Sequence, residues 1–171
     1  MIFDTHCHYN DESFDSDRSD LLKGLPGDGV DRICEIGYNL ESSEKAVYLA
    51  KQYKGTGLYV YSAVGFHPEN ADELNPDALQ KLEELSYSES VVAIGEIGLD
   101  YYRLDKRSPV EKEQDEEKKK RGEEVFEDFD PEPSVQKECF ITMIELAKKR
   151  NSDCDPFPGC GTGQLSYSKR P

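Results

Sequence analysis

The feature that most constrains the fold is an alternation, along the chain, of short apolar runs and amphipathic stretches. The apolar runs contain Val, Ile and Tyr and end close to Gly or Asp, which is typical of β-strands. They predict strands at 1–8, 30–37, 58–66 and 91–99. Strands that alternate with helices pair in parallel through right-handed crossovers. The sequence therefore predicts an α/β fold with four β/α units.

The stretches between the predicted strands carry helix signals. Residues 40–54 and 135–147 each place apolar side chains along one helical face, and a shorter pattern predicts a helix at 16–24. Asn75 followed by Pro76 marks another helix start, because the Asn side chain caps the first turn and proline needs no N–H partner. Leucines then follow at helical spacing: Leu79, Leu82 and Leu85.

Two segments break this rhythm. Residues 103–131 are dominated by charge, and they predict either an exposed helix with mixed-sign pairs or a poorly ordered insertion, of which we favour the insertion. Residues 152–171 lack the β-branched run that should follow a helix. The "GCGTG" run at 159–163 has no preceding strand, following helix or suitable lysine, so it is a poor candidate for a phosphate-binding loop.

Composition limits the function classes. The formal net charge is −15, whereas proteins that grip DNA through its phosphates are usually basic. The sequence shows no apolar run that could span a membrane and no basic-then-apolar leader, so we expect no membrane association and a soluble, cytoplasmic protein. The five cysteines lack the spacing of a structural zinc site, and we interpret them as reduced thiols.

Two histidines stand at the end of the first predicted strand. Positions i and i+2 of a strand point to the same side, so His6 and His8 should share one space while Cys7 faces away. Two neutral imidazoles at this spacing can hold one divalent cation, although two unrelated histidines at a strand end remain the alternative. Asp4 has the same phase and is either a third polar group of this face or a cap of the backbone.

Glu96 and His67 are the other candidates. Glu96 lies between Gly95 and Gly98 in an apolar run, where burying an unpaired carboxylate is costly and a metal would stabilise it. The alternative is a salt-bridged or exposed carboxylate. His67 follows the third predicted strand and precedes Pro68. Lone histidines at strand ends are often structural, but His67 should share one sheet edge with the other candidates, and active sites assemble at that edge of parallel α/β folds.

Taken together, these motifs closely resemble the TatD family of metal-dependent hydrolases. The matching runs are "DTHCH" at 4–8, "VGFHPE" at 64–69 and "AIGEIGLDYY" at 93–102. The segment "VQKECFITMIELAKKRN" at 135–151 is similar to the helix that follows the fourth strand in that family. The resemblance covers 1–103 and 132–151. The H-x-H pair alone is shared across the wider amidohydrolase superfamily, whereas G-x-H-P and G-E-I-G-L-D-Y-Y are typical of TatD.

The resemblance implies a TIM-barrel-type (β/α)8 fold, of which this chain holds about the first four units, with one or two metals at the carboxyl ends of the strands. It also implies hydrolysis of phosphodiester bonds in DNA, as in a deoxyribonuclease, with magnesium as the expected ion and zinc or manganese as alternatives. His6 and His8 would bind one metal, Glu96 would bridge the metal pair, and His67 would lie beside the substrate phosphate. Bound cations would also let an acidic protein approach a polyanion.

The sequence also departs from the family pattern. Family members continue through four more strands, which bring two further histidines and an aspartate that binds metal and acts as base. No histidine follows His67 here, so neither of the two later histidines can exist. Asp153 and Asp155 of the tail lie in no recognisable motif, so the catalytic base is unassigned. From about residue 151 the sequence no longer matches, which we interpret as a truncated product or an altered reading frame. A natural half-barrel with a new tail is the alternative.

We therefore expect residues 1–151 to form the N-terminal half of a TatD-like barrel, with a charged insertion at 103–131 and an irregular tail at 152–171. The first functional hypothesis is a TatD-type deoxyribonuclease, impaired by truncation. The second is an inactive half-barrel remnant that binds metal or a partner subunit. Another hydrolase of the H-x-H superfamily is a third option, against which the G-E-I-G-L-D-Y-Y run argues. Four units leave two bare sheet edges, so self-association through them is also expected.

Overall fold

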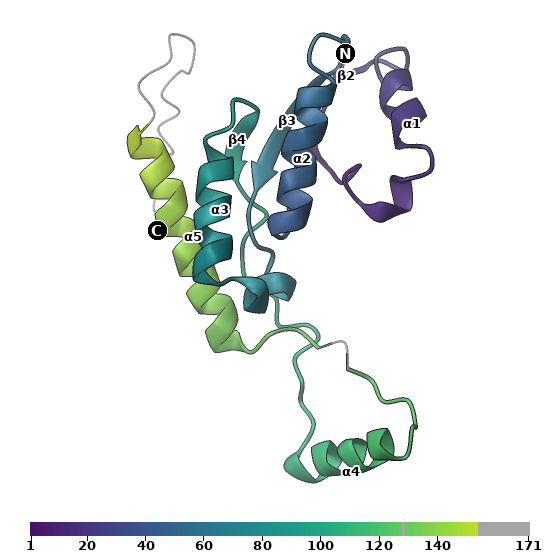
Figure 1. Cartoon of the computed structure of the whole chain (residues 1–171), viewed down its shortest axis with the longest axis vertical. Coiled ribbons are helices and arrows are strands. Elements are labelled where there is room, and N and C mark those ends of the chain that lie inside the picture. Colours follow the sequence, from purple (N-terminus) through teal and green to yellow (C-terminus); the bar gives the residue numbers. More distant parts are fainter. Residues whose placement is uncertain (128, 154–171) are drawn as a thin grey trace, which may run out of the picture.

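The computed structural model describes residues 1–127 and 129–153, and its centre is one parallel sheet (Figure 1). The four strands are β1 (Ile2–Cys7), β2 (Val30–Ile36), β3 (Tyr59–Val64) and β4 (Val91–Ile94). They lie in the order β1-β2-β3-β4, and every neighbouring pair is parallel. The α/β class and the parallel pairing are therefore confirmed, and the arrangement is that of a partial (β/α) barrel.

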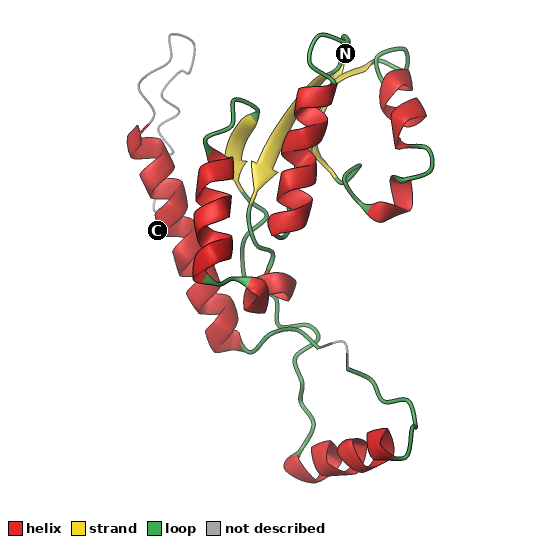
Figure 2. Cartoon of the chain, in the orientation of Figure 1, coloured by secondary structure: helices red, strands yellow, loops and turns green. Residues whose placement is uncertain are grey.

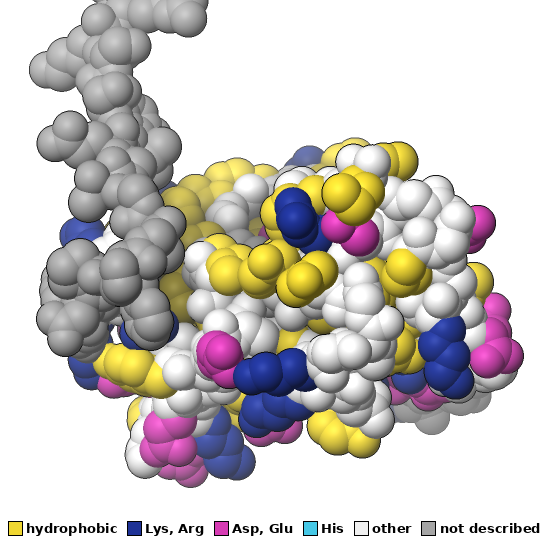
Figure 3. All heavy atoms as spheres, turned by 90° about the horizontal axis from the view of Figure 1, so that it is seen from above, with side chains coloured by type: hydrophobic (Ala, Val, Ile, Leu, Met, Phe, Trp, Pro, Cys, Tyr) yellow, Lys and Arg dark blue, Asp and Glu magenta, His cyan; other side chains and the backbone are white. Residues whose placement is uncertain are grey.

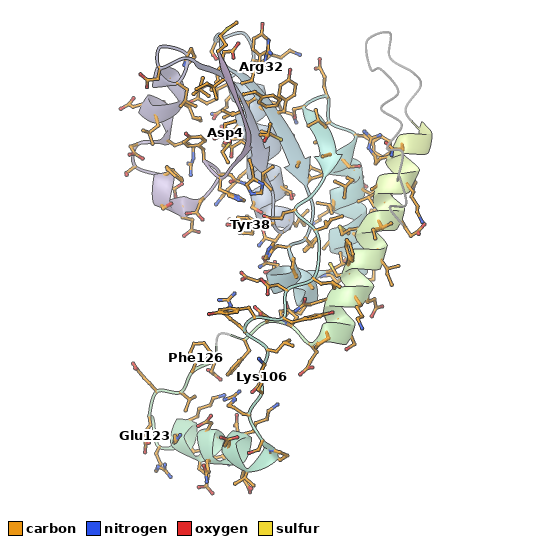
Figure 4. The ribbon with its side chains drawn as sticks, turned by 180° about the vertical axis from the view of Figure 1, so that it is seen from behind. Asp4, Arg32, Tyr38, Lys106, Glu123 and Phe126 are labelled. Atoms are coloured by element: carbon orange, nitrogen blue, oxygen red, sulfur yellow. The ribbon has the colours of Figure 1, made fainter. Side chains whose placement is uncertain are left out.

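Most of the helices lie on one face of this sheet (Figure 2). The α-helices are α1 (Arg18–Gly24), α2 (Leu40–Gln52), α3 (Pro76–Ser86), α4 (Pro109–Lys120) and α5 (Pro133–Asp153). Two short 3₁₀ helices are η1 (Glu12–Phe14) and η2 (Pro68–Glu73). As predicted, Asn75 begins α3 by accepting a hydrogen bond from the Ala78 backbone at 3.0 Å. Seen from behind, the other face of the sheet is not covered by any described helix (Figure 4).

The fourth strand is shorter than predicted. We expected it to run over 91–99, but it ends at Ile94. The Gly95 N–H still donates to the Val64 carbonyl at 2.9 Å, whereas the next N–H, that of Glu96, donates to the Gly37 carbonyl at 3.0 Å. Gly37 follows β2, so the chain leaves the ladder with β3 at this point. Residues 95–99 are consequently a loop at the carboxyl edge of the sheet.

The charged segment contains a regular helix. Our preference for a poorly ordered insertion is wrong over 109–120, where the structure has α4, and the alternative of an exposed helix with mixed-sign pairs is confirmed. Ser108 and Glu111 cap its start reciprocally, and Lys118 pairs with Asp115 at 2.8 Å. None of its residues is buried, and it lies well away from the sheet (Figure 1). It therefore contributes little to the core.

Two apolar clusters fix the helices on the sheet. One joins α2, α3 and α5 to β3 and includes fully buried Val64, Phe66, Leu82 and Met143. The other joins α1 and α2 to the first three strands and includes Leu22 and Ile33, both 0% exposed. Burial of such side chains stabilises a fold by roughly 1.5–3 kcal/mol each. The helices thereby hold the strands, and so the strand ends, in fixed relative positions.

The end of the sheet at which the strands begin has a chemically mixed surface. Figure 3 looks onto the end where the strands begin, and it shows hydrophobic, basic and acidic side chains intermixed, with no histidine visible among the described side chains.

In the described part of the chain, no helix is long and apolar enough to cross a membrane. The tail expected at 152–171 lies, from residue 154 on, outside the described residues, and so does its "GCGTG" run.

The core cluster makes a first prediction. Met143 is 0% exposed, whereas Ile141 on the same helix is 60% exposed. We expect Met143→Ala to lower the free energy of unfolding by about 2–5 kcal/mol, because it leaves a cavity between α5 and the sheet. Ile141→Ala, the matched control, should change it by less than about 0.5 kcal/mol. Urea denaturation followed by circular dichroism measures both, and equal effects would contradict the packing described here.

Candidate metal centre

His6 and His8 meet at the carboxyl end of β1. His6 is within the strand and exposed, and His8 follows the strand and is half-buried. Their Nε2 atoms are 3.1 Å apart. Cys7, between them, is buried on the opposite side, where its Sγ donates to the Cys34 carbonyl at 3.2 Å. The alternation predicted from the sequence is therefore present, and the two imidazoles face one space.

Glu96 reaches this space from the loop after β4. Its backbone N–H donates a hydrogen bond to the Gly37 carbonyl. This bond draws the loop toward the end of β2. Close contact with Gly65 permits this path, because a Cβ on Gly65 would lie 2.9 Å from the Gly95 carbonyl carbon. The Glu96 Oε2 atom consequently lies 3.8 Å from the His6 Nε2 atom.

The three side chains form a compact set of possible metal ligands. One ligand atom from each of His6, His8 and Glu96 lies within 4.8 Å of the other two. Two nitrogens bound about 2.1 Å from one ion, at an angle between a right angle and the tetrahedral value, are about 3 Å apart, which fits the observed 3.1 Å. Two imidazoles and a carboxylate are a donor set suited to divalent ions. The residues present therefore fit a metal.

The environment of His8 determines which of its ring nitrogens can bind a metal. His8 Nδ1 lies 3.2 Å from the Ile36 carbonyl oxygen, which can only accept, so Nδ1 is the donor. In the neutral ring the lone pair is then on Nε2, the atom that faces His6. The ring of Tyr38 lies beside His8, with centroids 5.9 Å apart. Figure 4 labels Tyr38 at the carboxyl end of the sheet, beyond Asp4 along the strands.

Asp4 and His67 lie outside the three-residue set. Asp4 Oδ1 accepts from the His6 backbone N–H at 3.1 Å, so Asp4 is a backbone cap, one of its two predicted roles. His67 precedes η2, and its Nδ1 accepts from the Glu69 N–H at 3.3 Å. Its backbone N–H donates to the Tyr38 carbonyl at 2.8 Å, which ties the loops after β2 and β3 together. The neutral His67 ring therefore carries its proton on Nε2 and can donate it.

Sequence reasoning missed a buried polar group beneath the histidines. Glu35, in β2, is 0% exposed and accepts from Cys7 Sγ at 3.3 Å and from the Asn10 N–H at 3.1 Å. Burial raises the pKa of the Glu35 carboxyl from 4.5 to about 7, against the opposing hydrogen bonds and the charge of Arg18. Burial also raises the pKa of the Cys7 thiol, which stays protonated. The sequence signal that could have indicated a buried carboxyl is the acidic residue near the end of the apolar run "VDRICEIG".

Arg18 secures the loop that follows β1. Its guanidinium donates to the Tyr9 carbonyl, to the Asp11 carbonyl at 2.6 Å and to Asp15 Oδ1 at 2.6 Å. These contacts join α1 to the backbone immediately after His8. The segment that carries the second histidine is thus held from α1 as well as from β2.

Comparison with known proteins identifies the family. The family model described as "TatD related DNase" matches residues 3–152. This chain belongs to the TatD-related DNase family. The match spans both the histidine pair and Glu96, and it ends within the last turn of α5.

Two relatives illustrate the similarity. A Bacillus subtilis protein described as an uncharacterized metal-dependent hydrolase, YabD, is 34% identical over 152 residues, 88% of this chain and 48% of the relative. A Cronobacter sakazakii protein named 3'-5' ssDNA/RNA exonuclease TatD is 35% identical over 102 residues, 60% of this chain and 37% of the relative. The chain thus spans about half, or less, of the length of these curated relatives.

Solved TatD-family structures share the fold. The crystal structure of YjjV, a TatD homologue from Escherichia coli, superposes with a TM-score of 0.60 at 24% identity, over 88% of this chain and 48% of that one. A TatD-family hydrolase from Entamoeba histolytica gives a TM-score of 0.66 at 22% identity, over 88% and 46%. At these identities the likeness concerns the fold.

The buried carboxyl makes a prediction about pH. The folded TatD-family chain holds the Glu35 proton up to about pH 7, whereas the unfolded chain releases it near the ordinary value of 4.5. The contribution of Glu35 to stability is therefore greatest below about pH 4.5, and it falls as pH rises to about 7, by up to about 3 kcal/mol.

Glu35→Gln should remove this pH dependence because the amide does not titrate. Urea unfolding at several pH values between 4 and 8 measures it as the stability difference between the original chain and the variant. As pH rises, the original chain should lose stability relative to the Glu35→Gln variant. Parallel stability curves for the two proteins would show that Glu35 has an ordinary pKa.

Proposed function

We propose that this chain binds a divalent metal through His6, His8 and Glu96 and belongs to a hydrolase that cleaves phosphodiester bonds in nucleic acid, DNA in the first place. The observation that carries the proposal is the convergence of three ligand atoms within 4.8 Å at the carboxyl edge of the sheet. The names of relatives support it, since one is called a metal-dependent hydrolase and another an exonuclease of single-stranded DNA and RNA.

Each residue has a role in this proposal. His6 and His8 supply neutral nitrogen ligands, and Glu96 supplies a carboxylate that can reach one ion or bridge two. A bound divalent ion would polarise a phosphoryl oxygen and lower the pKa of a coordinated water. His67 is the proposed phosphate contact, because its Nδ1 is engaged by the Glu69 N–H and its Nε2–H is left to donate. No catalytic base is assigned, since the ligand cluster of the described residues contains no aspartate.

The family resemblance favours magnesium as the ion. Donor chemistry adds a second consideration, because magnesium prefers oxygen ligands whereas imidazole nitrogens suit zinc and, with a carboxylate, manganese. The proposed site has two nitrogens and one carboxylate among its described ligands. We therefore propose one or two divalent ions and compare magnesium, manganese and zinc in the experiment.

Metal titration of the purified chain tests the metal site. Isothermal titration with each ion should give binding that His6→Ala and Glu96→Gln each weaken by at least about tenfold, which corresponds to 1.4 kcal/mol. Glu89→Gln is the matched control, because Glu89 is an exposed carboxylate that pairs with Lys54. Equal affinities in all four proteins would refute the metal site.

A nuclease assay on single-stranded DNA with the preferred ion tests the activity. His67→Ala should retain metal affinity but lower cleavage, because the proposed phosphate contact is lost. Cleavage that survives both His6→Ala and chelation of the metal would refute the metal-dependent nuclease.

A second candidate is a remnant without activity that binds a partner subunit. The observation that favours it is the uncovered face and edge of the sheet, where Phe3 is 46% exposed and Tyr59 and Val92 are each 58% exposed. Described residues leave the outer edges of β1 and β4 without a neighbouring strand. Unpaired edges with apolar side chains promote pairing between chains.

Light scattering after size-exclusion chromatography tests this candidate. We expect the chain to form dimers or larger species as its concentration rises, and Val92→Lys to shift it toward monomer because the charge blocks the β4 edge. Val110→Lys is the matched control, since Val110 is 62% exposed on α4, away from the sheet. A monomer at every concentration, or an equal effect of both substitutions, would contradict association through the edge.

A further inference from the structure

The buried Glu35 carboxyl has no part in the proposed metal site, yet it lies directly beneath it. It is 0% exposed within β2, and it shares the helix-covered side of the sheet with Ile33, which lies two residues earlier. Burying a carboxyl is costly, and an apolar side chain would fill the same space without that cost. The position of Glu35 therefore needs an explanation in terms of the groups that it contacts.

Glu35 supplies an acceptor to the loop that follows β1. Its Oε2 accepts from the Asn10 backbone N–H at 3.1 Å, and its Oε1 accepts from Cys7 Sγ at 3.3 Å. Asn10 is itself 1% exposed, so no water could replace the Glu35 carboxyl as the acceptor for its N–H. An unsatisfied buried N–H costs about 1–3 kcal/mol. Glu35 thus fixes the backbone of the loop two residues after His8.

The Asn10 side chain continues the connection to His8. Its Nδ2 donates to the Ile36 carbonyl at 2.9 Å and to the Ser42 carbonyl at 3.0 Å. The same Ile36 carbonyl lies 3.2 Å from His8 Nδ1. One oxygen at the end of β2 thereby accepts from both residues of the loop. If Asn10 moved, the loop would shift, and the distance between the His8 ring and this oxygen would change.

We propose that Glu35 is a positioning residue for His8: through Asn10 it holds the loop so that His8 donates from Nδ1 to the Ile36 carbonyl and presents Nε2 to the metal. This inference rests on the proposed function for its metal, but not for the orientation of the ring. Partners that fix the far nitrogen of a ligand histidine typically raise metal affinity about 10- to 100-fold.

Nuclear magnetic resonance of the histidine rings tests the orientation without metal. Long-range ¹⁵N–¹H spectra report which ring nitrogen carries the proton, and the chain has only three histidines to assign. At a pH above the ordinary imidazole pKa, His8 should be predominantly the Nδ1–H tautomer. Glu35→Leu removes the acceptor for Asn10 and should give a mixture of tautomers, whereas Glu35→Gln keeps an acceptor oxygen and should preserve the Nδ1–H form.

A matched control separates positioning from general destabilisation. Gln136 is also 0% exposed, and it makes hydrogen bonds to the backbone at Asp100 and Pro131. Gln136→Leu therefore removes a buried polar group of similar size and should leave the His8 tautomer unchanged. If Glu35→Leu does not fold, Asn10→Ala serves instead, because it removes the donor to the Ile36 carbonyl and leaves Glu35 in place.

Metal affinity completes the test. Titration with zinc should show affinity about 10- to 100-fold weaker in Glu35→Leu than in the original chain, and near normal in Glu35→Gln. An unchanged tautomer and unchanged affinity in both Glu35→Leu and Asn10→Ala would overturn the inference. A fixed tautomer that Glu35→Leu abolishes, in a chain that binds none of the three ions, would support positioning and refute the metal site instead.

Discussion

The candidate site depends on one geometric constraint, which is that parallel strands end at the same edge of their sheet. His6 and His8 belong to β1, and Glu96 follows β4, so they are separated by the whole width of the sheet. The path of the loop after β4, which includes the bond from the Glu96 N–H to the Gly37 carbonyl, brings their ligand atoms within 4.8 Å of one another. The arrangement of these three side chains is a product of topology more than of local sequence.

A second layer of polar contacts supports this edge. Glu35 and Asn10 hold the loop after β1 from below, Arg18 holds it from α1, and the His67 backbone joins the loops after β2 and β3. Most of these contacts join side chains to backbone groups that have no strand partner. Ligand geometry within a few tenths of an ångström needs support of this kind, because loops alone are mobile.

Periodicity and local chemistry predicted much of the fold. The period of two placed His6 and His8 together, and the Asn75 cap placed the start of α3. Over 109–120 the sequence did contain a helix signal, since Ser108 and Glu111 have the spacing of a capping box. The high charge of the segment was given more weight than this signal. The end of β4 depends on the close approach of Gly65 to Gly95, which joins distant segments and leaves no local pattern. Glu35 was open to the argument applied to Glu96, since both are acids in apolar runs.

Charge sets the conditions under which such a site could meet nucleic acid. The chain carries a formal net charge of −15, and the proposed ligand set consists of one of its carboxylates and two imidazole rings. Without a cation, this edge would repel a phosphate backbone. A bound divalent ion would make the local net charge positive. That charge acts over about one Debye length, roughly 8 Å at physiological salt. Substrate affinity should then depend on metal occupancy more than on many lysine contacts, and its decline with salt should be shallow compared with that of basic DNA-binding proteins.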